Sequence, residues 1–184
     1  MTISPLDRIQ GAAWFPDSRS ILILGSEPSK PLRLYRQERG GDPPKPIFHE
    51  SVIPNPNFPW AISNAISPDR KHILAVDATR TWQLYPLDGA SPRPVRGLSP
   101  WDVILGWTAD GRSVDVSESA MAVPFRGELI DMVTGRREPF REFGPADRAG
   151  LISMYVTSLS GTGDQYAYNY RQRSSALFIL SARK

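Results

Sequence analysis

Few side chains of this 184-residue chain could carry out chemistry, and they lie far apart in the sequence. There is no Cys, which excludes disulfides, thiolate catalysis and zinc–cysteine sites. The two histidines are His49 and His72, and the second follows Ser67 by five residues and Asp69 by three. A serine-hydrolase triad needs a His between an acid and a nucleophile, but these three residues surround a tight turn, and no G-x-S-x-G motif is present. We therefore interpret them as parts of the turn and predict that the chain is not an enzyme.

Four aspartates occur in similar short segments, each between two apolar runs. The segments are Phe15-Pro16-Asp17-Ser18, Ser67-Pro68-Asp69-Arg70, Thr108-Ala109-Asp110-Gly111 and Thr162-Gly163-Asp164-Gln165. Pro presets φ, Asp bonds the nearby backbone and Gly tolerates a positive φ, so these segments predict tight turns between paired strands. A calcium site would need several oxygen ligands close together, whereas successive aspartates are 52, 41 and 54 residues apart. We predict that Asp17, Asp69, Asp110 and Asp164 are structural turn residues and that the chain binds no metal or cofactor.

Two other groups of side chains are candidates for binding. Tyr166, Tyr168 and Tyr170 alternate along a predicted strand and so share one face. They form either a stacking platform for a sugar or base or, as we favour, packing between blades. The longer loop 117–125 ends in the apolar run Met121-Ala122-Val123-Pro124-Phe125. This run either folds back as a plug or marks a contact site, and we predict a partner face at Met121, Val123, Pro124 and Phe125.

The spacing of the turns indicates how the chain positions these residues. A repeat of roughly 40–50 residues with about four short strands is the period of a β-propeller blade. The sequence therefore predicts an all-β fold of four antiparallel blades at about 8–49, 60–97, 102–142 and 150–181. The Pro-rich segment 50–59 is predicted to be a connector on the surface. Trp60–Ile66 is the predicted inner strand of blade two, and Ala176–Leu180 is the third and last strand of an incomplete blade four. We expect an open arc that is part of a larger propeller.

Several of these segments resemble a known family. Trp14-Phe15-Pro16-Asp17 and Ile66-Ser67-Pro68-Asp69 resemble the S-P-D-G corner of TolB-type, WD-like bacterial propeller repeats. The end of that repeat's third strand is similar to Leu34-Tyr35 and Leu84-Tyr85. Its D-G-G-x-P-x-x-V step is similar to Asp88-Gly89 together with residues 92–95. The closing stretch, 164–180, resembles the final blade of propellers fused behind eukaryotic-type Ser/Thr kinases or winged-helix regulators. The resemblance implies a binding or sensing module and transfers no catalytic residues.

The amino-acid composition and charge of the chain limit the kinds of partner that it could bind. Hydrophobic residues make up 40% of the chain and charged residues 22%, as in a globular domain. The net charge is only +3 and the Lys and Arg residues are scattered, which disfavours nucleic acid. No segment is long and apolar enough to cross a membrane, and Met1–Gln10 has no apolar core of a signal peptide. As written the chain would be cytoplasmic, and it would be extracytoplasmic if it is a fragment of a receptor kinase.

The sequence thus predicts a non-catalytic propeller module for protein interaction or ligand sensing, part of a larger signalling protein. Its expected partner is a protein or peptide, with a small ligand also possible. The alternative is an accessory propeller of a prolyl oligopeptidase-like hydrolase whose catalytic domain lies outside this chain.

Overall fold

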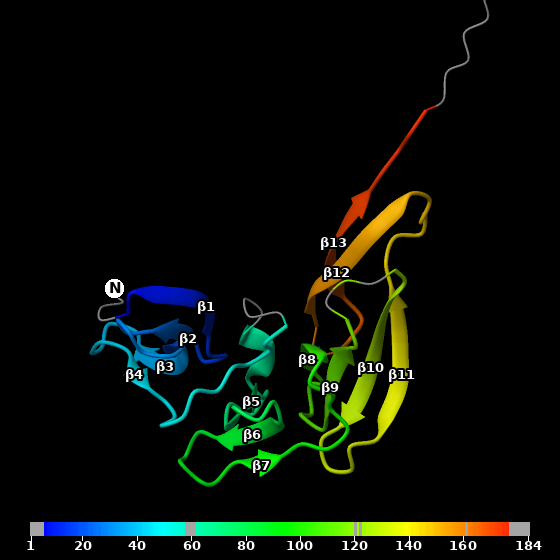
Figure 1. The fold of residues 1–184 in the computed structure, drawn as a ribbon. Helices are drawn as coiled ribbons and strands as arrows, with labels where there is room; N and C mark the ends of the chain where they lie inside the picture. The colour runs from blue at the N-terminus through cyan, green and yellow to red at the C-terminus, as the bar shows by residue number, and fades with distance from the viewer. Residues whose placement is uncertain (1–5, 58–61, 120, 122, 161, 177–184) are drawn as a thin grey trace, which may run out of the picture.

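Four antiparallel sheets follow one another in chain order in the computed structural model, which describes residues 6–57, 62–119, 121, 123–160 and 162–176 (Figure 1). Blade one contains β1 (Arg8–Trp14), β2 (Ser20–Ser26), β3 (Arg33–Glu38) and β4 (Lys45–Pro46). Blade two contains β5 (His72–Val76), β6 (Trp82–Pro86) and β7 (Arg93–Pro94). Blade three contains β8 (Val103–Trp107), β9 (Ser113–Ser117), β10 (Phe125–Asp131) and β11 (Arg137–Phe143). Blade four contains β12 (Leu151–Leu159) and β13 (Tyr166–Gln172).

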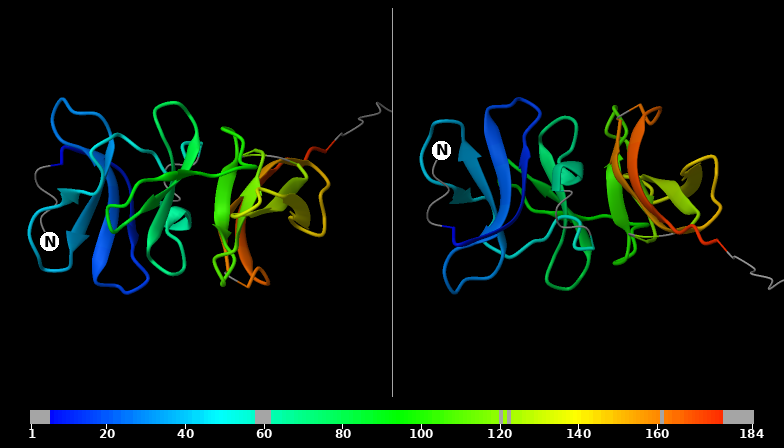
Figure 2. Two further views of the ribbon diagram at one scale, coloured as in Figure 1. Left: turned by 90° about the horizontal axis from the view of Figure 1, so that it is seen from below. Right: turned by 90° about the horizontal axis from the view of Figure 1, so that it is seen from above.

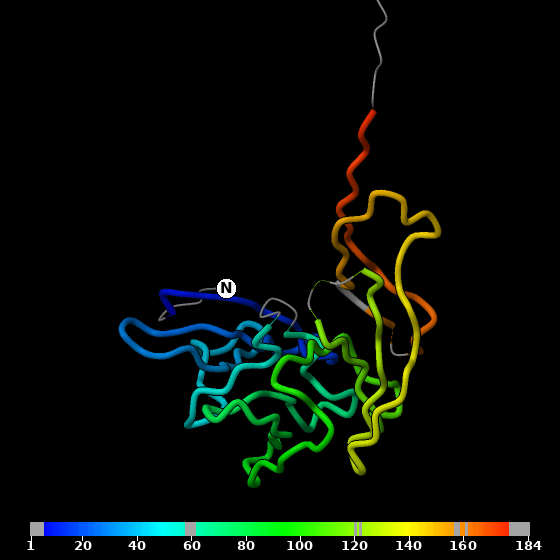
Figure 3. The backbone as a smooth tube through the Cα atoms, turned by 45° about the vertical axis from the view of Figure 1, so that its right-hand side comes forward, coloured from blue at the N-terminus to red at the C-terminus, as the bar shows by residue number. Residues whose placement is uncertain are grey.

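The four sheets form an open row. Figure 2 shows blade one at one end, blade two beside it, and blades three and four together at the other end. In Figure 3, the described residues after β13, 173–176, extend away from the sheets. The only helix among the described residues is the 3₁₀ helix η1 (Ile62–Ala65). The all-β fold of successive propeller-type blades in an open arc is therefore confirmed.

The hydrophobic cores lie between blades, because strands alternate their side chains between two faces. On β5, Ile73 packs into the core shared with blade one, and Leu74 packs into the core shared with blade three. On β8, Ile104 faces blade two, and Leu105 faces blade four. Each middle blade is thus buried on both sides, and its neighbours hold it in place.

Most of the described part of the segment between blades one and two, residues 50–57, is buried or half-buried, so its predicted surface path is wrong there. Val52 and Asn55 have no exposed surface. Ile53 forms an antiparallel bridge with Val76 on the inner edge of β5, with N···O distances of 3.1 and 3.0 Å. The Asn55 amide donates to the C=O of Ile104 at 3.0 Å and accepts from its N–H at 3.3 Å. The polar residues that favour a surface loop here satisfy a neighbouring strand instead.

The predicted inner strand Trp60–Ile66 of blade two is also wrong where the structure describes it. Ile62 and Ala65 are both buried and lie three residues apart, the period of the 3₁₀ helix that they form. Only Ile66 pairs with β5, through a single bridge to Ile73. Residues 58–61 lie outside the described part of the chain. So does most of the predicted strand Ala176–Leu180.

Candidate functional site

The predicted turn is present at the first three Asp corners, and the same bonds close each one. The N–H of the fourth turn residue donates to the C=O of the first, at 2.9 Å (Ser18 to Phe15), 2.9 Å (Arg70 to Ser67) and 2.8 Å (Gly111 to Thr108). The Asp Oδ1 accepts the N–H two residues on, at 2.9 Å (Arg19 to Asp17), 3.0 Å (Lys71 to Asp69) and 3.0 Å (Arg112 to Asp110). These N–H groups are the main cause of a lowered pKa at Asp17 and Asp110. The first three aspartates therefore hold the backbone of the corners.

The fourth corner has a different register from the predicted one. Its closing bond runs from the N–H of Gly163 to the C=O of Ser160 at 2.8 Å, and Gly163 has a φ of 72°. Thr162 therefore occupies the position that Asp holds elsewhere, 52 residues after Asp110. Asp164 lies two residues later, where its Oδ1 accepts hydrogen bonds from the hydroxyls of Ser160 and Thr162. Asp164 supports the turn from outside it.

Ser67, Asp69 and His72 lie together at the second corner, but in the arrangement of a turn. The Ser67 hydroxyl lies 2.5 Å from Asp69 Oδ1 and accepts the N–H of His72 at 3.0 Å. The imidazole Nδ1 lies 3.7 Å from Asp69 Oδ2. The corner of blade three repeats this network without a histidine, because Thr108 bonds Asp110 at 2.7 Å and accepts the N–H of Ser113 at 3.0 Å. The recurrence indicates a structural motif.

The tyrosines are divided between packing and exposure. The ring of Tyr166 packs edge-on against Phe143 of blade three, with centroids 4.9 Å apart. Tyr168 stacks on Tyr170 at 5.9 Å, and Tyr170 is exposed. The inner end of the tyrosine row therefore packs between blades, as favoured from the sequence.

The predicted partner face is divided by the structure. Met121 and Val123 are 64% and 43% exposed, and Pro124 is half-buried. Phe125 is the first residue of β10, is 1% exposed and packs edge-on against Phe143 at 5.9 Å. The prediction that Phe125 contacts a partner is wrong, because its ring belongs to the core between blades three and four. Contacts of Met121, Val123 and Pro124 with a partner stay a prediction.

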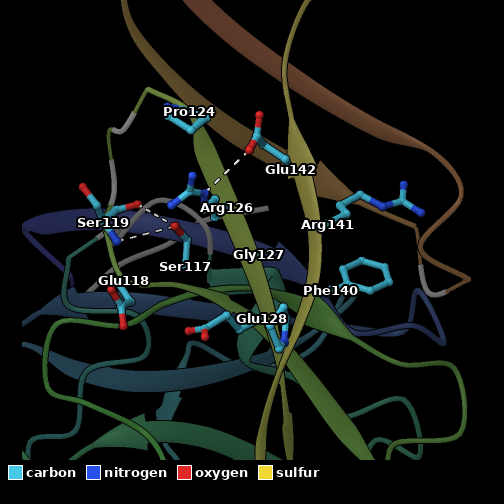
Figure 4. Close-up of a pocket in the computed structure, with 11 residues that line it drawn as sticks. Ser117, Glu118, Ser119, Pro124, Arg126, Gly127, Glu128, Phe140, Arg141 and Glu142 are labelled. Atoms are coloured by element: carbon cyan, nitrogen blue, oxygen red, sulfur yellow. Dashed lines mark hydrogen bonds and ion pairs between the residues drawn. The ribbon is translucent and has the colours of Figure 1, made fainter.

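Beside these residues, blade three carries a groove of about 570 Å³, termed the blade-three groove (Figure 4). Its walls come from the end of β9, the loop after it, β10 and β11. It is lined by Ser117, Glu118, Ser119, Pro124, Arg126, Gly127, Glu128, Pro139, Phe140, Arg141 and Glu142. Figure 4 shows Glu118 on one side of β10 and Phe140 with Arg141 on the other. The groove therefore combines both signs of charge with an aromatic surface.

Ion pairs position the groove's charged side chains. Arg126 and Glu142 are directly opposite in the β10–β11 register, and Arg126 Nε lies 3.6 Å from Glu142 Oε2. Glu142 also pairs with Arg148. Both arginines lower the pKa of Glu142, and Arg148 has the larger effect. The guanidinium of Arg141 lies 4.8 Å from the ring centre of Phe140. Sequence reasoning missed these groups because strand pairing, and not sequence proximity, brings them together.

A buried ion pair holds the first residue of β11, Arg137, in place. Arg137 reaches both carboxylate oxygens of Asp102, at 2.9 and 3.3 Å, and Asp102 is fully buried. Arg137 also pairs with Glu128 on β10, which lines the groove. The pair therefore links the segment before β8 to the strands that carry the groove.

Within the described residues, no group of three or more His, Asp or Glu side chains is placed to hold a metal ion. No helix in the described part of the chain is long and apolar enough to cross a bilayer.

Known structures share this fold. No protein-family model and no curated protein matches the chain. The crystal structure of TolB from Acinetobacter baumannii matches 90% of this chain and 43% of its own length, with a TM-score of 0.55 and 14% identity. A putative TolB from Agrobacterium tumefaciens matches 91% of this chain and 62% of its own length, with a TM-score of 0.52 and 16% identity. The chain spans less than two thirds of either protein. At these identities the likeness is one of fold, and the chain has the blade architecture of TolB-type β-propellers.

Proposed function

We propose that this chain is a non-catalytic interaction module that binds an extended peptide segment of a protein partner in the blade-three groove. The observation that carries the proposal is an open groove of about 570 Å³ with exposed apolar side chains, Met121 and Val123, in the loop that borders it. Exposed apolar side chains beside a groove are typical of contact sites, and the flexible Met side chain adapts to different partners.

The groove's side chains indicate which peptide would fit. The side chains of Glu118 and Arg126 are largely exposed, and their ion pairs with Arg137 and Glu142 are long, at 3.8 and 3.6 Å, so a charged partner group can compete for both. Phe140 and the stacked Arg141 form an aromatic surface for an apolar anchor. A segment with one apolar anchor flanked by an acidic and a basic residue complements this pattern.

The absence of catalysis is part of the proposal and is supported by the second corner. The Ser67 hydroxyl is engaged by Asp69 and by the main chain of His72, which leaves it poorly placed as a nucleophile. The equivalent corner at Thr108 has the same bonds and no histidine. A structural role in the turn accounts for the hydrogen bonds at both corners, whereas a catalytic role would account only for those at the corner that has a histidine.

A random-peptide display library selected on the purified chain tests the proposal. Binding of the enriched peptides is then measured by fluorescence polarisation on Met121→Ser and Arg126→Glu variants. Each variant is expected to weaken binding at least about tenfold, since the loss of an anchoring side chain at an interface costs more than about 1.4 kcal/mol. The melting temperature should stay nearly unchanged, because both side chains are exposed.

Matched controls lie elsewhere on the surface. Val133 is the most exposed large apolar side chain among those described and is in the turn between β10 and β11, and Arg39 is exposed on blade one. Val133→Ser and Arg39→Glu should leave peptide binding unchanged. Enriched peptides that bind all four variants equally, or a selection that yields no binder, would contradict the proposal.

A further inference from the structure

Strand β9 has one polar face, and that face is buried. Val114 and Val116 point into the core shared with blade two. The alternate residues Asp115 and Ser117 point the other way, and both are 2% exposed. On the other middle blade, the equivalent strand β5 buries Leu74 and Val76 on the face that it turns to the next blade. Blade three therefore places a carboxylate where blade two has a hydrocarbon side chain.

The Asp115 carboxylate has no hydrogen-bond donor among the described residues. Neither oxygen is within bonding distance of one. Its neighbours across the sheet are Gly106 on β8 and Leu129 on β10, which have no polar side chain. Arg141 on β11 is the charged group whose field reaches Asp115, but its guanidinium stacks on Phe140. A buried carboxylate without a partner is costly, which is why burial raises the pKa of Asp115 to about 7.

Glycine makes room for this carboxylate. A Cβ atom at Gly127 would lie 2.8 Å from Asp115 Oδ1 and 2.7 Å from the ring of Phe143. Any larger residue at this position would displace one of them. The local structure thus accommodates a charged group inside the sheet packing.

Asp115 also lines a cavity of about 60 Å³ between blades three and four, termed the inter-blade cavity. Two aromatic residues, Trp107 and Phe140, and two leucines, Leu129 and Leu159, line the same cavity. The volume has room for a group of a few non-hydrogen atoms. The hydroxyl of Thr162, also at the cavity, is already engaged by Asp164.

We propose that the inter-blade cavity binds a small cation with N–H donors, either ammonium or the ammonium group of a primary alkylamine, with Asp115 as its counter-ion. The hydroxyls of Thr108 and Ser160 at the cavity are, like that of Thr162, engaged by Asp110 or Asp164. One free carboxylate beside aromatic and aliphatic side chains suits an organic ammonium group, which aromatic rings also attract. A divalent metal ion would need several oxygen ligands, and the cavity offers one carboxylate. Ammonium N–H groups would supply the donors that Asp115 lacks.

The test is thermal unfolding of the chain at about pH 8, where the Asp115 carboxylate is charged. Methylammonium chloride is compared with sodium, potassium and tetramethylammonium chlorides at matched ionic strength. A ligand that binds only the folded state raises the melting temperature, and methylammonium is expected to raise it by about 3–5 °C when well above its Kd. The other three salts should give no such shift. Line broadening of the methylammonium methyl signal in NMR measures binding directly.

Two variants locate the effect. Asp115→Asn keeps the shape of the side chain and removes its charge, so it should fold and lose both the melting shift and the line broadening. Asp88→Asn changes an exposed aspartate on blade two and should keep both. Equal shifts in all four salts, no shift in any salt, or a response that survives in Asp115→Asn would each overturn the proposal.

Discussion

Asp69 shows how one side chain holds a corner of the fold. Its Oδ1 lies 2.5 Å from the Ser67 hydroxyl and 3.0 Å from the N–H of Lys71, and the Ser67 hydroxyl is the largest cause of its lowered pKa. Asp69→Ala removes both bonds, and we expect the free energy of unfolding to fall by about 1 kcal/mol, measured by urea denaturation.

A matched variant separates the corner from an ordinary turn. Asp88 accepts the N–H of Ala90 at 3.0 Å, so Asp88→Ala removes one described bond and should have a smaller effect. A larger loss at Asp88 would contradict this account of the corners. A stoichiometric cation that disappears in Asp69→Ala would show that the corner binds metal.

Phe125 is expected to matter for stability. Its ring is 1% exposed and contacts Phe143 between blades three and four. Truncation leaves a cavity, so Phe125→Ala should lower the free energy of unfolding by about 3–5 kcal/mol. Met121→Ser, at an exposed position of the loop before β10, should change it by less than about 0.5 kcal/mol. Similar values for the two variants would contradict the core assignment of Phe125.

Asp115 should make stability depend on pH. Its pKa is raised from 3.8 to about 7 by burial, so the folded state binds the proton more tightly than the unfolded state. Stability contributed by this group is therefore full below about pH 4 and is lost as pH rises to about 7, by on the order of 4 kcal/mol. The corner aspartates act in the opposite direction, since their lowered pKa values favour the folded state above pH 3.8.

Urea denaturation of the wild type and Asp115→Asn across this pH range checks the assignment. The variant's stability relative to the wild type should increase as pH rises, because Asn carries no charge at any pH. Arg141 is the charged side chain that faces Asp115, while Gly106, Leu129 and Leu159 on the other packed strands do not titrate. If the difference in unfolding free energy between the variant and the wild type did not change with pH, Asp115 would have to be solvated or paired in the folded state.

Among the elements, β11 depends on one buried ion pair. Asp102 is fully buried and accepts the Ser99 N–H at 2.7 Å in addition to two bonds from Arg137. Arg137→Gln leaves this carboxylate without its cation, and we expect a loss of about 3–5 kcal/mol in the free energy of unfolding. Arg136 is a suitable control because its side chain is exposed, and Arg136→Gln should cost less than about 1 kcal/mol. Equal losses would contradict the role of the pair.

The sequence predicts those elements whose structure depends on residues a few positions apart, and it does not predict those whose structure depends on contacts between distant residues. The corners at Asp17, Asp69 and Asp110 follow from turn chemistry within a few residues. The path of residues 50–57 does not, because the Asn55 side chain bonds the main chain of Ile104, 49 residues away. The groove likewise depends on the pairing of Arg126 with Glu142 across two strands. The sequence did contain a local sign of the unusual carboxylate. Asp115 lies between Val114 and Val116 in a predicted strand, so its side chain points to the face opposite the two valines, and in a blade between two others that face is also buried.

At the scale of the whole molecule, the cores between blades determine how the chain unfolds. Among the residues that the structure describes, three separate cores join blades one and two, two and three, and three and four. In the open row, the two end blades share no core. Stability should then be close to a sum of terms for neighbouring blades, as in repeat proteins.

Native-state hydrogen exchange on two core variants tests this nearest-neighbour coupling. Leu24 lies in the core between blades one and two, and Met154 lies in the core between blades three and four. Each truncation to Ala should destabilise its own core by about 2–5 kcal/mol. Leu24→Ala is expected to lower amide protection mainly in β2 and β5, and Met154→Ala mainly in β10 and β12, because opening of one core leaves the distant core packed. Loss of protection that is equal in all four blades for both variants would mean that the row unfolds as a single cooperative unit, and the pairwise account would have to be abandoned.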